Sequence, residues 1–176
     1  MASRIILDAR QVELTINRLC YQLIENHGRF TDTVLAGIQP RGVPFADRLV
    51  KRLQALTGLA ISYGKIDPTF HRDDYRHSPT HLLPSEMHMP FLIENKKVVL
   101  IDDVLYTGRT TRAAMDALLD FGRPARVELM VLIDRRFTRE VPLQADYVGK
   151  TVDSLASEKV KVQWSDNESD NKIWIV

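Results

Sequence analysis

Two adjacent carboxylates followed by a hydroxyl-rich turn are the residues of this chain best suited to chemistry. The apolar run Val98–Ile101 leads directly into Asp102 and Asp103. The residues that follow are rich in backbone and hydroxyl donors: Thr107, Gly108, Thr110 and Thr111. Such donors at the start of a helix bind phosphate. Because carboxylates repel a phosphate unless they hold sugar hydroxyls or a metal ion, the stretch predicts a site for a phosphorylated sugar with a divalent cation.

The pattern around these residues predicts a strand, a turn and a helix. Val98–Ile101 is rich in β-branched residues, which is typical of a strand buried on both faces of a parallel sheet. A buried helix face follows at Ala114, Met115, Leu118 and Leu119. The alternative is a strand-to-helix connection that is merely capped by Asp and Thr, but two carboxylates directly after a buried strand are costly to place without a ligand.

Strand-like and helix-like segments alternate along the chain. Helices are predicted from the N-cap Asp8 to Gly28, and from a first turn containing Pro44 to Gly58. Further strands are predicted at 34–38, 59–66, 127–133, 146–149 and 159–162, with an edge strand at 173–176. This order predicts one α/β domain, residues 1–176, with a mainly parallel twisted sheet flanked by helices. Since ligands bind beyond the carboxyl ends of such strands, Arg41, Asp102, Asp103 and Asp134 should converge on one crevice.

Composition excludes several other classes of protein. The chain has 176 residues and a formal net charge of +1, so no overall positive field favours nucleic acid. Neither a dinucleotide-binding G-x-G-x-x-G nor a P-loop motif is present. No apolar run approaches membrane-spanning length, so no membrane partner is expected. Cys20 is the single cysteine and falls on a helical apolar stripe, which predicts a buried, inert thiol in a cytoplasmic protein.

Val98–Thr110 resembles the thirteen-residue signature of type I phosphoribosyltransferases, which use 5-phosphoribosyl-1-pyrophosphate (PRPP). Its version, Asp-Asp-Val-Leu-Tyr-Thr-Gly-Arg-Thr, is similar to that of the bifunctional pyrimidine operon regulators with uracil phosphoribosyltransferase activity. Other similar segments cover most of the chain: Ile5–Asp8, Arg41–Gly42, Arg72–Asp74, Met115–Leu118, Gly122–Pro124, Asp134–Arg135, Ala145–Lys150 and Ser157–Val160. The resemblance implies the type I phosphoribosyltransferase fold, with a small hood from about 145–176 plus the N-terminal segment, and a flexible loop at about 67–90.

The resemblance also assigns the reacting groups. Asp102 and Asp103 would hold the ribose hydroxyls, directly or through waters of a bound Mg²⁺, and Arg41 would hold pyrophosphate. The remaining PRPP- and phosphate-binding residues would be Pro40, Gly42, Val104, Leu105, Tyr106, Thr107, Gly108, Arg109, Thr110 and Thr111. Because the reaction breaks the bond to pyrophosphate through an oxocarbenium-like state, Mg²⁺ and Arg41 should stabilise the leaving group. The alternative for Arg41 is a solvated arginine at a helix start.

The pyrophosphate loop departs from the family at one point. The family often has Lys-Thr where this chain has Gln39-Pro40, so one positive charge is missing. A cis peptide is common at this place in the family, and the cost of cis falls from about 3 kcal/mol to below about 1 kcal/mol before proline. We therefore predict that the Gln39–Pro40 peptide is cis.

The residues that the resemblance places around the base are Asp134, Arg135, Tyr147, Val148 and Val160. Related 6-oxopurine enzymes carry an aspartate at the Tyr106 position, as acid for the imidazole ring, and a lysine at the Asp134 position. A pyrimidine has no imidazole ring, and a carboxylate accepts from an N–H, so both differences favour uracil. Tyr147 would stack on the base and Val148 would meet its edge. The alternatives are that both residues are plain strand core, and that the base is a 6-oxopurine.

Two further assignments concern a loop and an RNA. His71, Arg72, Asp73 and Asp74 match the flexible loop that closes over PRPP and excludes water, although Asp73 and Asp74 also fit a solvated charge cluster.

The regulators bind a messenger hairpin in response to UMP and attenuate transcription, and Arg18 and Arg139 lie at suitable positions for this. Positions 17, 21, 138 and 144 (Asn, Tyr, Thr and Gln) depart from the regulators.

Uracil phosphoribosyltransferase activity is thus the expected function, together with regulation of pyrimidine genes through the mRNA leader. The expected partners are PRPP, uracil, UMP, pyrophosphate, Mg²⁺ and the leader RNA, and a homo-oligomer is expected as in the family. Two alternatives are an RNA-binding attenuator with little catalysis and a nucleotide-binding domain without catalysis.

Overall fold

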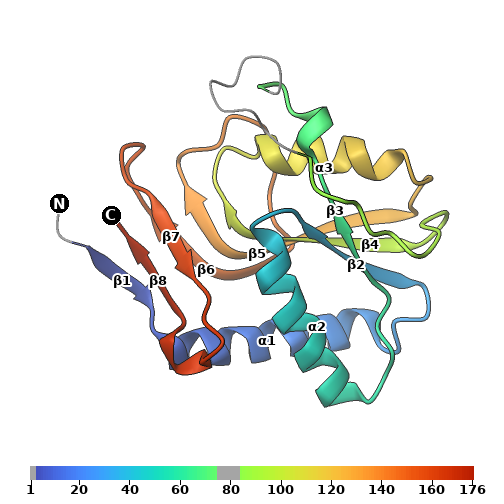
Figure 1. The fold of residues 1–176 in the computed structure, drawn as a ribbon, viewed down its shortest axis with the longest axis horizontal. Helices are drawn as coiled ribbons and strands as arrows, with labels where there is room; N and C mark the ends of the chain where they lie inside the picture. Colours follow the sequence, from blue (N-terminus) through green and yellow to red (C-terminus); the bar gives the residue numbers. More distant parts are fainter. Residues whose placement is uncertain (1–2, 75–83) are drawn as a thin grey trace.

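The computed structural model describes residues 3–74 and 84–176. A parallel sheet of order β3-β2-β4-β5-β6 lies at its centre, with α3 on one face and α1 and α2 on the other (Figure 1). The strands are β2 (Thr33–Ile38), β3 (Tyr63–Ile66), β4 (Lys97–Leu105), β5 (Arg126–Arg136) and β6 (Tyr147–Asp153). The helices are α1 (Ala9–His27), α2 (Gly42–Thr57) and α3 (Arg109–Leu119). The predicted α/β fold with a mainly parallel sheet is confirmed.

The two ends of the chain form a second, antiparallel sheet of order β1-β8-β7, beside the main sheet (Figure 1). Its strands are β1 (Arg4–Leu7), β7 (Val160–Gln163) and β8 (Lys172–Ile175), and the short helices η1 (Thr69–His71) and η2 (Glu168–Asp170) lie in connections. The prediction of an edge strand at 173–176 is wrong, because β1 covers the edge of β8 that would otherwise be free.

The first helix begins and ends where its sequence predicts. Asp8 and Gln11 form a capping box: Asp8 Oδ1 accepts from the Gln11 N–H at 2.8 Å, and Gln11 Oε1 accepts from the Asp8 N–H at 3.0 Å. Gly28 ends α1 with a φ of 57°, and Gly58 ends α2 with a φ of 68°. Both are left-handed conformations that glycine adopts without strain.

The strands that carry the predicted site differ in length from the prediction. β4 does not end before its carboxylates but continues through them to Leu105, and β5 continues through Asp134 to Arg136. The two strands stay paired over this extension, with Asp102 opposite Val131 and Leu105 opposite Asp134. Backbone pairing between β4 and β5 thus extends both strands beyond their apolar runs, through residues with polar side chains. β3, in contrast, begins only at Tyr63 rather than at Leu59.

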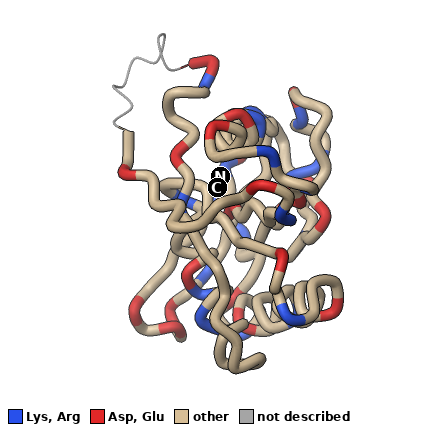
Figure 2. The backbone as a smooth tube through the Cα atoms, turned by 90° about the vertical axis from the view of Figure 1, so that its right-hand side faces the viewer, with Lys and Arg blue, Asp and Glu red and all other residues tan. Residues whose placement is uncertain are grey.

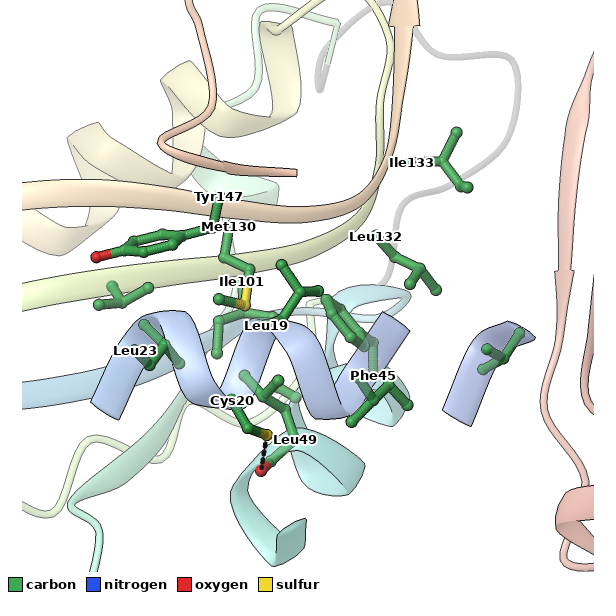
Figure 3. Close-up of a cluster of buried hydrophobic side chains, with 14 of the residues drawn as sticks. Leu19, Cys20, Leu23, Phe45, Leu49, Ile101, Met130, Leu132, Ile133 and Tyr147 are labelled. Carbon is green, nitrogen blue, oxygen red and sulfur yellow. Dashed lines mark hydrogen bonds between the residues drawn. The ribbon is translucent and has the colours of Figure 1, made fainter. Parts of the chain in front are cut away.

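The core lies on both faces of the main sheet. Val98–Ile101 is completely buried, as predicted. Figure 3 shows the layer between the sheet and α1 and α2, where Leu19, Leu23 and Phe45 meet strand residues. The Cys20 thiol lies in this layer 3.7 Å from the Leu49 carbonyl oxygen, and burial raises its pKa to about 12, which confirms an inert thiol. Among the described residues, no helix is long and apolar enough to cross a membrane.

Candidate active site

The carboxylates of Asp102 and Asp103 lie near the carboxyl end of the central strand β4, and each residue is 7% exposed. The Asp103 N–H donates to Asp102 Oδ1 at 2.9 Å. Burial raises the pKa of both side chains, and the charge of Asp103 raises the pKa of Asp102 further. The Arg41 guanidinium acts in the opposite direction on both pKa values. Ligands that donate hydrogen bonds or carry positive charge would therefore stabilise this pair.

The loop before α2 approaches the carboxylates closely. The Gln39–Pro40 peptide is cis, as predicted. A Cβ atom on Gly42 would lie 2.4 Å from the Ile101 carbonyl oxygen and 3.0 Å from Asp102 Cα, so only glycine allows this contact. Arg41 is exposed and forms no ion pair with the described residues, which leaves its guanidinium free for an anion. Arg41 thus lies close enough to the two carboxylates for its charge to lower the pKa of both.

The turn after β4 presents an open helix end. Gly108 adopts a φ of 88° and precedes α3, whose first residue is Arg109. The N-cap residue Gly108 has no side chain that could cap this helix. The Arg109 N–H donates weakly to Thr107 Oγ1 at 3.4 Å, and the N–H groups of Thr110 and Thr111 remain available to an anion. Thr111 is buried, whereas Thr107 and Thr110 are half-buried at the turn. The residues predicted to bind the 5′-phosphate therefore surround a site of the right polarity.

The segment after β5 supports this turn from outside. The carbonyl oxygen of Thr107 accepts from the N–H groups of Glu140 at 2.9 Å and Val141 at 3.1 Å. Arg139 donates to the carbonyl oxygen of Tyr106, and its guanidinium lies 2.5 Å from Asp134 Oδ1. These contacts connect the turn to Asp134, the residue that follows the buried part of β5.

Comparison with known proteins agrees with this geometry. The family model described as "Phosphoribosyl transferase domain" matches residues 3–167. The chain belongs to the phosphoribosyltransferase family. It is 44% identical over 165 residues to the bifunctional protein PyrR of Listeria welshimeri, covering 92% of this chain and 90% of the relative. It is 41% identical over 175 residues to that of Enterococcus faecalis, covering 99% and 97%.

Solved structures show the same fold. The hypoxanthine phosphoribosyltransferase of Staphylococcus aureus is similar with a TM-score of 0.65 at 24% identity, covering 85% of this chain and 77% of that chain. The Trypanosoma cruzi hypoxanthine phosphoribosyltransferase gives a TM-score of 0.72 at 17% identity, covering 98% and 90%. The predicted resemblance to type I phosphoribosyltransferases, and to the bifunctional regulators among them, is confirmed.

In this phosphoribosyltransferase, several of the residues predicted to surround the base make contacts within the chain instead. Arg135 is 5% exposed, and its guanidinium donates to Ser154 Oγ at 2.8 Å and to the carbonyl oxygens of Leu155 and Glu158, both at 2.9 Å. Its Cζ atom lies 4.1 Å from the centre of the Tyr106 ring. These partners within the chain take up Nε and Nη2 of the guanidinium, and the predicted contact of Arg135 with the base stays a prediction.

The stacking role predicted for Tyr147 is wrong. Tyr147 is the first residue of β6 and pairs with Met130, so it lies before the carboxyl end of the sheet. Its ring lies between the sheet and α1, near Met130 (Figure 3). Its hydroxyl donates to Glu128 Oε2 at 2.8 Å and lies 3.1 Å from His27 Nε2. The alternative, strand core, is what the structure shows.

The other two predicted base contacts also take part in packing. The Val148 carbonyl oxygen accepts from the Arg18 guanidinium at 3.3 Å, and Val160 is 8% exposed in the core cluster. The alternation along β6 and two isolated polar residues, His27 and Glu128, are the sequence signals that could have shown a buried network at this end of the sheet.

The described part of the predicted flexible loop packs against α3. His71 Nε2 lies 3.0 Å from Asp120 Oδ2, and Asp73 lies 2.5 Å from the Arg109 guanidinium. Arg109 also pairs with Glu140 at 2.5 Å, so this side chain joins two loops instead of offering a free charge to phosphate. Arg72 pairs with Asp74 at 2.7 Å. Residues 75–83 of the predicted loop lie outside the described residues.

The two arginines expected to bind RNA both have partners within the chain. Arg18 donates to the carbonyl oxygens of Val148 and Gly149 and so joins α1 to β6. Arg139 lies at the edge of the crevice, as described above. In the view of Figure 2, Lys and Arg are interspersed with Asp and Glu along the chain. This distribution fits the formal net charge of +1.

Proposed function

We propose that this protein transfers the 5-phosphoribosyl group from PRPP to uracil, which gives UMP and pyrophosphate. The observation that carries the proposal is the buried pair Asp102 and Asp103 between an uncapped helix start and the Arg41–Gly42 loop. In this arrangement the two carboxylates offer hydrogen-bond acceptors to a sugar. The helix start and the loop offer donors to the phosphate groups on either side of that sugar.

Each group has a role that follows from its chemistry. The two carboxylates would accept from the 2′- and 3′-hydroxyls of the ribose and orient it. The first N–H groups of α3 and the hydroxyls of Thr107 and Thr110 would bind the 5′-phosphate. The exposed Arg41 guanidinium would stabilise the negative charge that develops on pyrophosphate as its bond to the sugar breaks.

The residues present fit a magnesium ion that is shared with the substrate. The described residues contain no group of three or more His, Cys, Asp or Glu side chains that would bind a metal by themselves. Mg²⁺ is usually held by one or two carboxylates together with substrate phosphates, which is what Asp102 and Asp103 provide. When bound, the ion would supply charge neutralisation at the leaving group.

Uracil is favoured over a purine because this chain lacks the aspartate that would serve as the acid for a purine imidazole ring. Tyr106 stands where the 6-oxopurine enzymes have an aspartate, and the Asp134 carboxylate accepts hydrogen bonds instead of donating them. Turnover with uracil, hypoxanthine, guanine and orotate, each with PRPP and Mg²⁺, tests this proposal. We expect UMP formation from uracil as the main reaction, and exclusive use of a purine would contradict it.

We also propose a second function, the UMP-responsive regulation of pyrimidine genes through the mRNA leader. Its support is the 41–44% identity to relatives that are named bifunctional protein PyrR, over more than nine-tenths of this chain. A salt-dependent gel shift with the pyrimidine-operon leader RNA of the same organism, with and without UMP, tests it. We expect UMP to strengthen the shift, and no shift at any UMP concentration would leave only the enzyme. Sedimentation of the same sample tests the expected homo-oligomer.

A further inference from the structure

The side chains of Tyr106 and Arg135 form a pair at the carboxyl end of the main sheet. Tyr106 directly follows β4, and Arg135 lies one residue beyond the point where Leu105 of β4 pairs with Asp134 of β5. The Arg135 Cζ atom lies 4.1 Å from the centre of the Tyr106 ring. At this separation the face of the ring and the guanidinium attract each other.

The partners of Arg135 leave its charge uncompensated. The guanidinium is buried and donates to one hydroxyl and two carbonyl oxygens, those of Ser154, Leu155 and Glu158. No carboxylate in the described part of the chain forms an ion pair with it. The electron-rich face of Tyr106 therefore adds to the stabilisation that the three hydrogen bonds give this buried charge. Moving the ring away from the guanidinium would cost this cation–π attraction.

The backbone of Tyr106 is fixed as well. Its carbonyl oxygen accepts from Arg139, whose guanidinium pairs with Asp134. Tyr106 is nevertheless 37% exposed, so part of the residue remains accessible to a ligand. Tyr106 thus lies three residues beyond Asp103 in the sequence and is connected to Asp134 through Arg139.

We propose that Arg135 is a positioning residue that holds the Tyr106 ring as a fixed wall of the base pocket, and that this wall restricts the pocket to a one-ring base. The inference rests on the proposed transfer to a nucleobase and names the device that selects among bases. A purine is larger than uracil by a fused five-membered ring. On this proposal it could enter only if the Tyr106 ring moved away from Arg135, which would remove the cation–π attraction between them.

Two substitutions of Tyr106 separate the ring from its hydroxyl. Discrimination is measured as the ratio of kcat/KM for uracil to that for hypoxanthine; where hypoxanthine gives no turnover, its inhibition constant against uracil is used. Tyr106→Ala should reduce this discrimination by about tenfold or more, in the range that a single pocket contact supplies. Tyr106→Phe keeps the ring face and should retain the discrimination within about threefold, whatever its absolute rate.

A double-mutant cycle tests whether Arg135 acts through the ring. Arg135→Lys keeps the charge but loses the planar stack and the three-acceptor geometry, and should lower the discrimination in the wild-type background. In the Tyr106→Ala background it should change the discrimination by less than about threefold, because the wall is already absent. Arg136→Gln is the matched control: Arg136 is the next residue of β5 and is exposed, and its guanidinium contacts Asp153 and the Phe137 ring. It should leave the discrimination unchanged.

The outcomes distinguish this inference from the proposed function. If the wild-type protein makes no nucleotide from PRPP and any base, the proposed transfer itself fails. If it makes UMP but Tyr106→Ala keeps the wild-type discrimination, the wall is wrong and the transfer stands. An Arg135→Lys effect of equal size in both backgrounds would show that Arg135 acts independently of Tyr106. Should Arg135→Lys fail to fold, as judged by circular dichroism, the two Tyr106 variants still decide whether the wall exists.

Discussion

Substitution of Gly42 by alanine probes the contact that brings the pyrophosphate loop to the carboxylates. An added Cβ would lie 2.4 Å from the Ile101 carbonyl oxygen, 3.0 Å from Asp102 Cα and 3.2 Å from Asp102 Oδ1. Two of these three atoms are backbone of a fully buried central strand, which cannot rotate away. The start of α2 must therefore move outward with Arg41. We expect a loss of about 1–3 kcal/mol in stability, as for other overpacked sites.

The effect on catalysis should be larger than the effect on stability. A displacement of about 1 Å in a group that stabilises the leaving group costs on the order of 10²-fold in rate. Gly58→Ala, at the other end of the same helix, is the matched control. Gly58 has a φ of 68° with no atom within 4 Å of an added Cβ, so alanine there costs backbone strain of about 1–2 kcal/mol without displacing a neighbour.

Steady-state kinetics with PRPP and uracil, alongside thermal unfolding, separate the two effects. We expect both variants to unfold at lower temperature, and only Gly42→Ala to lose about 10²-fold in kcat/KM for PRPP. Equal activity of the two variants, at comparable stability, would refute the idea that close approach of this loop to Asp102 sets the geometry of catalysis.

Three further substitutions test other parts of the site. Asp102→Asn should abolish most activity yet raise the unfolding temperature at pH 7. Because burial raises the pKa of Asp102, its ionisation costs stability as the pH rises above the unfolded value of about 3.9. The gain should vanish below that pH, and a gain that persisted there would exclude ionisation as its cause. Arg41→Gln should reduce kcat/KM for PRPP by about 10²-fold. It should also lower the unfolding temperature at pH 7, because the Arg41 charge opposes the rise in the pKa of both buried carboxylates. An equal loss in a PRPP-independent binding assay for UMP would contradict its assignment to pyrophosphate. Tyr147→Phe should cost about 1–2 kcal/mol through the lost hydrogen bond to Glu128 while the KM for uracil stays unchanged, whereas a raised KM would restore Tyr147 to the base site.

The site was predictable from the sequence where local signals agree. The apolar run before Asp102, the glycine-containing turn and the proline before Arg41 each have a short-range physical cause, and the structure brings all of them together. The ends of α1 and α2 were predictable for the same reason, because Gly28 and Gly58 are needed for left-handed backbone.

What could not be predicted depends on partners that are distant in the chain. β4 and β5 continue past their apolar runs because each pairs with the other, and β8 lies inside its sheet because β1 joins it from the opposite end of the chain. Arg135 was expected at the base, and acceptors at 154, 155 and 158 take up Nε and Nη2 of its guanidinium. Tyr147 faces α1 because its register with Met130 places it before the crevice. Apart from the alternation along β6 and the isolated polar residues His27 and Glu128, the local sequence pattern does not indicate these pairings.

The central claim concerns the transfer of phosphoribose to uracil at the Asp102–Asp103 pair. The most direct measurement is the stoichiometry of UMP and pyrophosphate formed from labelled uracil and PRPP in the presence of Mg²⁺, for the wild type and for Asp103→Asn. We expect the wild type to form both products in equal amounts and the variant to lose on the order of 10²-fold in rate. Absence of UMP with the wild type, or full activity in the variant, would contradict the account.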